Sequence, residues 1–324
     1  MKHPSLYRRL LLSSAAALAM TSASAWTDKP VKLLVPAPAG GTMDVVARVI
    51  AQQLSADIGQ PVVVDNRPGA GGGIAVQALL QAPADGLTIM VTADNILTEI
   101  PHVMKLPYDP LKDVKPIATV ARASMVMVAA PNVPAENVKA FASYVKANPG
   151  KVSFASYSAG TTSHYAGMIL NQKEGLDMQH VPFAGSPPAL QQLMGGQIQV
   201  MFDGIVTSMP QVKAGKLKAY GVAARTRSVH LPDVPTLTEL GYPELVFGNW
   251  IGVIASNALP ADITAKINAA VIKAADAPAI KSRLQAAGFE ANTPATSAEL
   301  VQGLRADFER NAAIVKRFDI RLNQ

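Results

Sequence analysis

Short β-branched segments alternate with amphipathic helical patterns along this chain, and that alternation is the feature that most constrains its fold. Residues 31–35 predict a strand, and residues 42–57 predict a helix whose apolar side chains share one face. A strand at 62–64, a helix near 74–82 and a strand at 87–92 follow. This order predicts a mainly parallel, doubly wound α/β sheet that binds ligands at the carboxyl ends of its strands.

The same alternation resumes after a proline-rich connection at 106–110. Further strands are expected at 125–129, 152–156, 178–182, 199–203, 218–223 and 250–255, and further helices at 135–147, 161–173, 187–195, 205–214, 261–275, 278–286 and 297–316. Two sheets joined by more than one crossing predict two lobes with a cleft between them. We expect the chain to cross between the lobes near residues 123 and 247.

The first 25 residues have the pattern of a signal peptide. Lys2, Arg8 and Arg9 form a basic segment, residues 10–20 are apolar, and Ala23-Ser24-Ala25 is a small-residue cleavage site. We expect cleavage after Ala25 and export to the periplasm. Ordinary secretion is favoured over the twin-arginine route, because the residues around Arg8 and Arg9 match that signal only in part.

Composition excludes several classes of function. The chain has no cysteine, so neither disulfides nor thiol catalysis is available. The leader carries three Lys/Arg residues and no acid, so the formal charge of +6 becomes +6 − 3 = +3 after processing. Basic residues are scattered and not interleaved with aromatic residues, so we expect no nucleic-acid partner. A mildly positive protein is compatible with a small anionic ligand.

The loop between the first strand and the first helix is the most informative candidate site. Its candidate binding residues are Pro38, Ala39, Gly40, Gly41, Thr42 and Asp44. Backbone N–H groups at such a helix start attract anions, and we expect Thr42 to cap the helix. Asp44 either bonds to its own loop, holds ordered water or acts as a partner of the helix dipole. The loop has no catalytic base and no metal-ligand pair, so we expect binding without catalysis, metal or cofactor.

Seven short motifs, taken in order, carry a resemblance to a known family. They occupy residues 36–44, 66–72, 106–110, 160–164, 180–183, 196–197 and 231–236. With them the mature chain resembles the periplasmic solute-binding receptors of tripartite tricarboxylate transporters, the Bug proteins. The resemblance implies a two-lobed, type II-like periplasmic-binding-protein fold that closes on a carboxylate. It also implies integral-membrane permease subunits as partners.

The resemblance supports a return of the C-terminal helices to the first lobe. Lobe 1 is then expected to comprise residues 26–123 and 247–324, and lobe 2 residues 124–246. In lobe 2 the resemblance implies that a hydroxyl-rich loop clamps one ligand carboxylate. The candidate residues of that lobe are Ser158, Ala159, Gly160, Thr161, Thr162, His164, Ala184, Gly185, Ser186 and Asp203. His164 is equally compatible with a structural role, Ser186 is expected to cap a helix, and Asp203 either reads a ligand hydroxyl or amine or completes a turn.

Three alternatives stay open at this point. A secreted serine hydrolase would use Ser158, Asp203 and His230, although the residues around Ser158 match the nucleophile elbow only in part. A dinucleotide enzyme would use the glycine-rich segment 69–74, whose connection to the preceding strand is longer than the fingerprint requires. A sensor would present the closed receptor to a membrane signalling protein.

The expected ligand is a di- or tricarboxylate, an acidic amino acid or an aromatic carboxylate such as terephthalate. We expect the receptor to be a monomer.

Overall fold

Strand pairing divides the fold into two sheets that share one long strand. In the computed structural model, which describes residues 26–290 and 297–320, the first sheet begins with β1 (Val31–Val35), paired in parallel with β2 (Val62–Asn66) and β3 (Thr88–Ala93). Strand β9 (Gly248–Ser256) runs antiparallel to β3 and to the first part of β4 (Val114–Ala129). The first lobe is therefore a mixed sheet with a parallel half.

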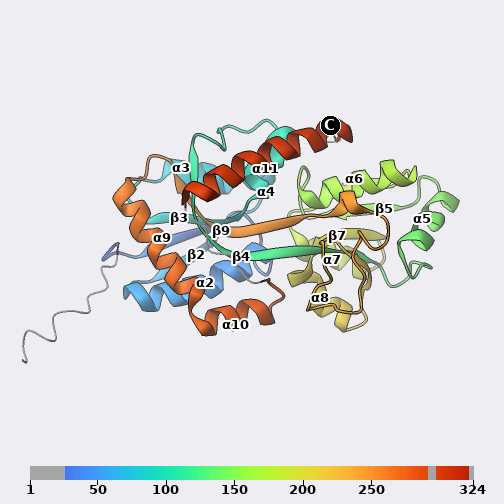
Figure 1. Ribbon diagram of the computed structural model, residues 1–324, viewed down its shortest axis with the longest axis horizontal. Coiled ribbons are helices and arrows are strands. Elements are labelled where there is room, and N and C mark those ends of the chain that lie inside the picture. The colour runs from blue at the N-terminus through green and yellow to red at the C-terminus, as the bar shows by residue number, and fades with distance from the viewer. Residues whose placement is uncertain (1–25, 291–296, 321–324) are drawn as a thin grey trace, which may run out of the picture.

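The second sheet is built on the last part of β4. There β4 pairs in antiparallel fashion with β7 (Val200–Gly204) and β8 (Lys218–Val222). Strand β7 is parallel to β5 (Ser153–Ser156), which is parallel to β6 (Gln179–Pro182). The two sheets lie side by side in Figure 1, and β4 runs from one into the other.

The helices cover both faces of these sheets. They are α2 (Thr42–Ile58), α3 (Gly73–Gln81), α4 (Asn95–Thr98), α5 (Val138–Ala147), α6 (Thr162–Glu174), α7 (Ser186–Met194), α8 (Ile205–Lys213), α9 (Ala261–Asp276), α10 (Pro278–Ala286) and α11 (Ser297–Arg317), with short 3-10 helices at Ala70–Gly72, Ile100–His102 and Pro243–Leu245. None of the described helices is long and apolar enough to span a bilayer.

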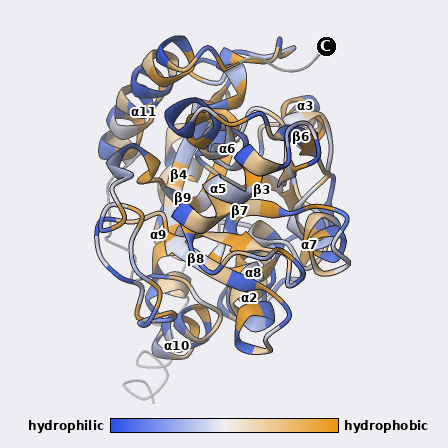
Figure 2. Cartoon of the chain, turned by 90° about the vertical axis from the view of Figure 1, so that its right-hand side faces the viewer, coloured by the Kyte–Doolittle hydropathy of each residue, from blue (hydrophilic) through white to orange (hydrophobic). Residues whose placement is uncertain are grey.

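Alternation along the strands explains how each sheet is buried on both faces. In β1, Val31, Leu33 and Val35 pack into the apolar cluster formed with α2 and α9, while Leu34 packs into a second cluster with α3 on the opposite face. A third cluster fills the second lobe. Seen from that end, hydrophobic residues gather on the central strands, and the helices around them carry hydrophilic residues (Figure 2).

The last helices pack back on the first lobe. Residues of α9 and α10 such as Ile267 and Leu284 belong to the same apolar cluster as α2. Helix α11 lies across the top of the molecule in Figure 1, where Leu304 packs in the first lobe and Ile320, just beyond the helix, packs in the second. The molecule is thus two-lobed, as predicted, while the expected bounds of the lobes stay a prediction.

One strand differs clearly from the sequence-based expectation. The segment 125–129 was expected to be a strand by itself, but β4 begins eleven residues earlier, at Val114. The strand changes its antiparallel partner from Gly248 of β9, opposite Ser124, to Gly204 of β7, opposite Met125. Local periodicity detects a buried segment but not its continuation into a second sheet, because that continuation depends on partners that lie far away in the sequence.

Candidate functional site

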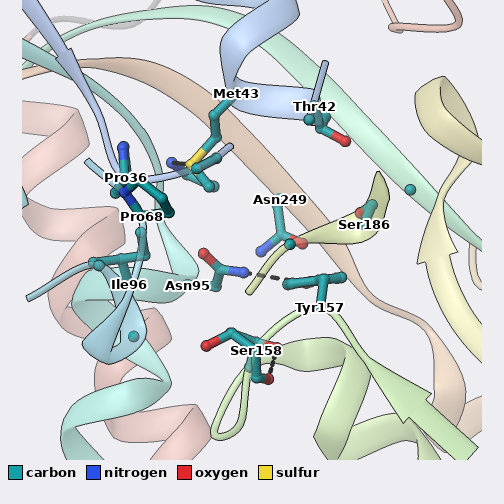
Figure 3. A pocket seen from close by; sticks show the side chains of 18 of the residues that line it. Pro36, Thr42, Met43, Pro68, Asn95, Ile96, Tyr157, Ser158, Ser186 and Asn249 are labelled. Atoms are coloured by element: carbon teal, nitrogen blue, oxygen red, sulfur yellow. Dashed lines mark hydrogen bonds between the residues drawn. The ribbon is translucent and has the colours of Figure 1, made fainter. Parts of the chain in front are cut away.

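A cavity of about 260 Å³ lies between the lobes, at the carboxyl ends of β1, β3, β5 and β6. Figure 3 shows its polar side chains facing one another from both lobes. The polar lining residues are Thr42, Asn95, Ser124, Tyr157, Ser158, Thr161, Ser186 and Asn249. Apolar side chains complete the wall, among them Met43, Ile96, Ile100, Met125, Phe183 and Ile251. The volume lies just below the roughly 300–1,000 Å³ of drug-sized sites, so the cavity suits a small solute.

Asp44 holds the first loop in shape. Its carboxylate, buried in the first turn of α2, accepts hydrogen bonds from the backbone N–H of Gly40 (2.9 Å), from Arg48 Nε (2.8 Å) and from Asn66 Nδ2 (2.9 Å). Burial raises the pKa of Asp44, but these hydrogen bonds and the charge of Arg48 outweigh it, so the pKa is lowered. Asp44 therefore has all its partners within the protein. The N-cap of α2 is Gly41, not Thr42 as predicted, because Thr42 is already helical.

The second loop, between β5 and α6, brings Tyr157, Ser158 and Thr161 to the cavity. The hydroxyl of Thr161 donates to the carbonyl oxygen of Ser158 (2.7 Å), and the backbone N–H of Gly160 donates to His164 Nδ1 (3.3 Å). Gly160 has φ +77°, which favours glycine. The loop is thus a closed turn that presents hydroxyl groups but no cationic side chain.

A carboxyl group of the protein occupies the N-terminus of α6. The backbone N–H and the hydroxyl of Thr162 both hydrogen-bond to the side chain of Glu99, which lies at the end of α4 in the first lobe. The hydroxyl of Tyr165 donates to the Glu99 carbonyl oxygen (2.7 Å). Burial raises the pKa of Glu99 to about 8, against the opposing effect of its bonds with Thr162. Thr162 was expected to bind the ligand, but here it binds the other lobe.

Histidine 164 is part of a buried ring stack behind the loop. Its ring lies 3.9 Å from that of His180, which stacks on Phe154 at 5.0 Å. His180 Nε2 and Ser156 Oγ are 2.7 Å apart. Burial lowers the pKa of His164 to about 4 and, together with the neighbouring His164, that of His180 to about 3. Both rings are therefore neutral at physiological pH, and His164 packs rather than lining the cavity.

Asp203 positions Ser186 from behind the cavity wall. Its buried carboxylate accepts from Ser186 Oγ (2.5 Å), Thr207 Oγ1 (2.6 Å) and Ser208 Oγ (2.7 Å). Burial raises its pKa, and the three hydroxyl groups oppose that rise. The N-cap of α7 is Gly185, and the Ser186 side chain, predicted to cap the helix, turns to Asp203 instead.

The predicted site residues fall into two equal groups. Those that line the cavity are Pro38, Gly41, Thr42, Ser158, Thr161, Ala184, Gly185 and Ser186. Those placed outside the lining are Ala39, Gly40, Asp44, Ala159, Gly160, Thr162, His164 and Asp203. Within the second group the polar side chains already have protein partners, and Ala39 and Gly40 are exposed. Contact of any of these residues with a ligand stays a prediction.

Sequence reasoning missed several lining residues. Asn95 and Ile96 follow the carboxyl end of β3, where the fold class places ligands, so their position was a usable signal. Tyr157 lies inside the predicted loop but was not among its candidates. Asn249 carried no local signal, because its role depends on a partner in a distant segment, and the same holds for Glu99, which does not line the cavity but binds Thr162 beside it.

Charged side chains are absent from the cavity wall. Among the described residues that line it there is no Lys, Arg, His, Asp or Glu. An anion would therefore rely on backbone N–H groups at the start of α2, on the helix dipole and on hydroxyl groups. The lobes approach each other closely beside the cavity: a Cβ placed on Gly185 would lie 2.4 Å from Pro38 Cγ, and one on Gly160 would lie 2.5 Å from Val103 Cγ2.

The chain is similar to known proteins over most of its length. The family model described as "Tripartite tricarboxylate transporter family receptor" matches residues 46–320. Protein BugT of Bordetella pertussis is 31% identical over 97% of this chain and 96% of its own. The periplasmic binding protein BugD superposes with a TM-score of 0.86 at 31% identity, over 91% of this chain and 99% of its own. MatC from Rhodopseudomonas palustris, solved with bound malate, gives a TM-score of 0.84 at 34% identity, over 89% and 99%. The chain thus belongs to the tripartite tricarboxylate transporter receptor family.

Proposed function

We propose that this protein captures a small carboxylate in the cavity between its lobes and delivers it to membrane permease subunits of the tripartite tricarboxylate type. Membership of the family makes it a periplasmic carboxylate-binding receptor and not an enzyme. The identity of the ligand and of the membrane partner belongs to the proposal. So do the predicted monomeric state and the predicted cleavage after Ala25, which lies outside the described residues.

The observation that carries the proposal is a neutral cavity at a helix start. Gly41 and Thr42 bring the N-terminus of α2 to the wall, and Ser158 brings a hydroxyl group from the opposite lobe, where the Thr161 hydroxyl closes the loop on the Ser158 carbonyl oxygen. Each hydrogen bond to a charged group contributes about 1.5–3 kcal/mol. Four such bonds are enough for micromolar affinity, which corresponds to about 8 kcal/mol. The bound carboxylate of MatC, malate, supports the same ligand class here.

The hydrolase and dinucleotide alternatives are wrong, since the family consists of solute-binding receptors. The positions of the three proposed triad residues also argue against the hydrolase. Asp203 binds three hydroxyl groups of its own lobe, none of them Ser158, and the His230 ring lies against the Phe289 carbonyl oxygen (3.2 Å). The proposed triad is therefore not assembled.

A thermal-shift screen over carboxylic acids tests ligand binding. An acid present at a hundredfold excess over its dissociation constant adds about 2.7 kcal/mol to the free energy of unfolding. For a protein of this size we expect the melting temperature to rise by about 5 °C. A screen in which no mono-, di- or tricarboxylate shifts the melting temperature contradicts the proposal.

Thr161→Ala tests the opposite lobe's part in the site. Loss of its hydroxyl, which both lines the cavity and closes the loop on Ser158, should weaken binding of the best acid about tenfold. Thr238→Ala is the matched control, because Thr238 is exposed and outside the cavity lining. Equal affinities of the two variants, measured by calorimetry, would remove this loop from the site.

Delivery to a permease is tested separately from binding. In a strain that lacks the permease subunits, uptake of the identified acid should stop although the receptor still binds it. Persistent uptake, together with loss of an acid-dependent transcriptional response when the receptor is deleted, would favour the sensor role.

A further inference from the structure

Asn95 and Tyr157 join the two lobes across the cavity. Asn95 comes from the start of α4 in the first lobe, and its Nδ2 donates to the Tyr157 hydroxyl of the second lobe at 3.2 Å. Both residues line the cavity, and Figure 3 shows the bond between them. Asn95 is only 4% exposed, so its amide must find its partners inside the site.

The Asn95 amide faces Tyr157 with its NH₂ group, because Nδ2 donates to the Tyr157 hydroxyl oxygen. The amide oxygen of Asn95 consequently points away from Tyr157 (Figure 3).

That oxygen is a buried acceptor without a partner. Among the described residues no donor reaches Asn95 Oδ1, and an unpaired buried acceptor costs about 1–3 kcal/mol. The other amide in the wall, Asn249, uses its Nδ2 on Asp94 at 2.8 Å. Asn95 Oδ1 is therefore a group for which a ligand can supply the missing donor.

The donor should be neutral. A ligand ammonium group needs a carboxylate partner, but the acids around the cavity already have partners in the protein. These are Asp44 with Arg48, Asp94 with Asn249, Glu99 with Thr162 and Asp203 with Ser186. A hydroxyl or amide N–H group can use a neutral amide oxygen without such a partner.

We propose that Asn95 is a specificity residue that accepts a hydrogen bond from a neutral donor on the ligand, so that the receptor selects hydroxy- or amido-carboxylic acids over acids that lack this donor. The proposal rests on the proposed function, because it concerns the ligand of the same cavity. It narrows the expected ligands by disfavouring the acidic amino acids.

Matched sets of acids on one carbon skeleton test the selection. Suitable sets are malate, succinate and aspartate; mandelate, phenylacetate and phenylglycine; and 4-hydroxybenzoate with benzoate. Calorimetry at pH 7 should show the hydroxy acid binding at least tenfold more tightly than its deoxy and amino counterparts in any set that binds. If a deoxy acid binds equally well, or if the best acid of the wider screen has no neutral donor, the inference is wrong. If no acid binds, the proposed function fails with it.

Two substitutions locate the selection at this residue. Asn95→Leu also removes the bond to Tyr157, so it should weaken binding of both acids, but it should reduce affinity for the hydroxy acid at least tenfold more than affinity for the deoxy acid. Asn95→Asp keeps the acceptor and adds a charge, so the amino acid of the set should now bind more tightly than the hydroxy acid. Asn257→Asp, on the exposed surface, controls for the added charge. An unchanged preference in both Asn95 variants, with melting curves that show folded protein, overturns the assignment.

Discussion

Replacing Glu99 by glutamine should stabilise the protein at neutral pH and have a smaller effect in mild acid. Glu99 is 3% exposed, and it binds Thr162 of the opposite lobe through both carboxyl oxygens. Burial raises its pKa from 4.5 to about 8, so the folded protein keeps a proton that the unfolded chain loses. Glutamine imitates the protonated form, since its oxygen can accept from the Thr162 N–H while its NH₂ donates to the threonine oxygen.

The sign of the effect follows from proton linkage. Below pH 4.5 Glu99 is protonated in both states, so pH has no effect through this residue. Between pH 4.5 and about 8 only the folded state holds the proton, so the wild-type protein loses stability as pH rises. The slope is about 1.4 kcal/mol per pH unit. From pH 5.5 to 7.5 the wild type should lose about 2.7 kcal/mol relative to Glu99→Gln.

The interactions that favour an ionised Glu99 are weaker than the desolvation that opposes ionisation. The dipole of α6 favours an ionised Glu99 at its N-terminus by roughly 0.3–2 kcal/mol. Desolvation of a buried carboxylate costs several kcal/mol, and the nearby Asp94 adds repulsion. Arg310 of α11 attracts the charge but ranks last among the causes of the pKa change. Burial should therefore decide the direction.

Melting temperatures of the two proteins, measured from pH 5.5 to 7.5, test this reasoning. At about 2 °C per kcal/mol, the advantage of Glu99→Gln should grow by about 5 °C over this range. The test uses only the difference in melting temperature between the two proteins, because protonation of the buried histidines affects both proteins equally. Glu309→Gln, an exposed position on α11, should show no such trend. A difference that stays constant with pH, or that shrinks as pH rises, refutes a buried protonated Glu99.

Three further changes test other parts of the structure. Gly185→Ala should weaken ligand binding more than tenfold and should also lower the melting temperature of the free protein, because the new Cβ meets Pro38 across the cleft and the φ of +118° at this position disfavours alanine; calorimetry and melting curves would check this. Asp203→Ala should lower the free energy of unfolding by about 2–4 kcal/mol in urea titrations, since three hydroxyl groups lose their acceptor. His180→Phe should reduce the loss of stability on acidification from pH 6.5 to 4. The folded-state pKa of His180 is lowered to about 3, so on acidification the unfolded chain binds the proton first and is favoured. A fall in melting temperature over that range as large in the variant as in the wild type would contradict this.

The sequence was sufficient for most of the fold because the fold is built from local periodicity. Val31–Val35 alternates between two apolar clusters, and α2 presents one apolar stripe, so both could be recognised from a few residues. The first part of β4 was missed because Pro116 and mixed residues obscure its pattern, and only β9 makes it a strand.

The site was predictable in position but not in detail. Strand ends locate the loops, yet whether an acid faces the cavity depends on its partners in distant elements. Asp203 was a reasonable candidate for ligand binding from its position at a strand end. In the structure, however, its carboxylate accepts hydrogen bonds from Ser186, Thr207 and Ser208. The helix start at Thr162 was an equally reasonable anion site, but the anion there is Glu99, 63 residues earlier in the chain. Residue type and spacing do not predict such a pairing between distant residues.

The hydrogen bonds of the acidic side chains near the cavity explain how a neutral cavity can select an anion. Asp44, Asp94, Glu99 and Asp203 lie close to the cavity, and each is bound to donors that hold it away from the wall. An ionised ligand that enters the cleft therefore meets hydroxyl groups and the α2 N-terminus without a facing carboxylate, whose repulsion at low dielectric would cost several kcal/mol. Because Glu99 and Asn95 make their bonds only when the lobes meet, the same contacts that remove these groups from solvent also enclose the ligand. The hydrogen bonds that hold the lobes together are therefore the same ones that allow the cavity to select an anion.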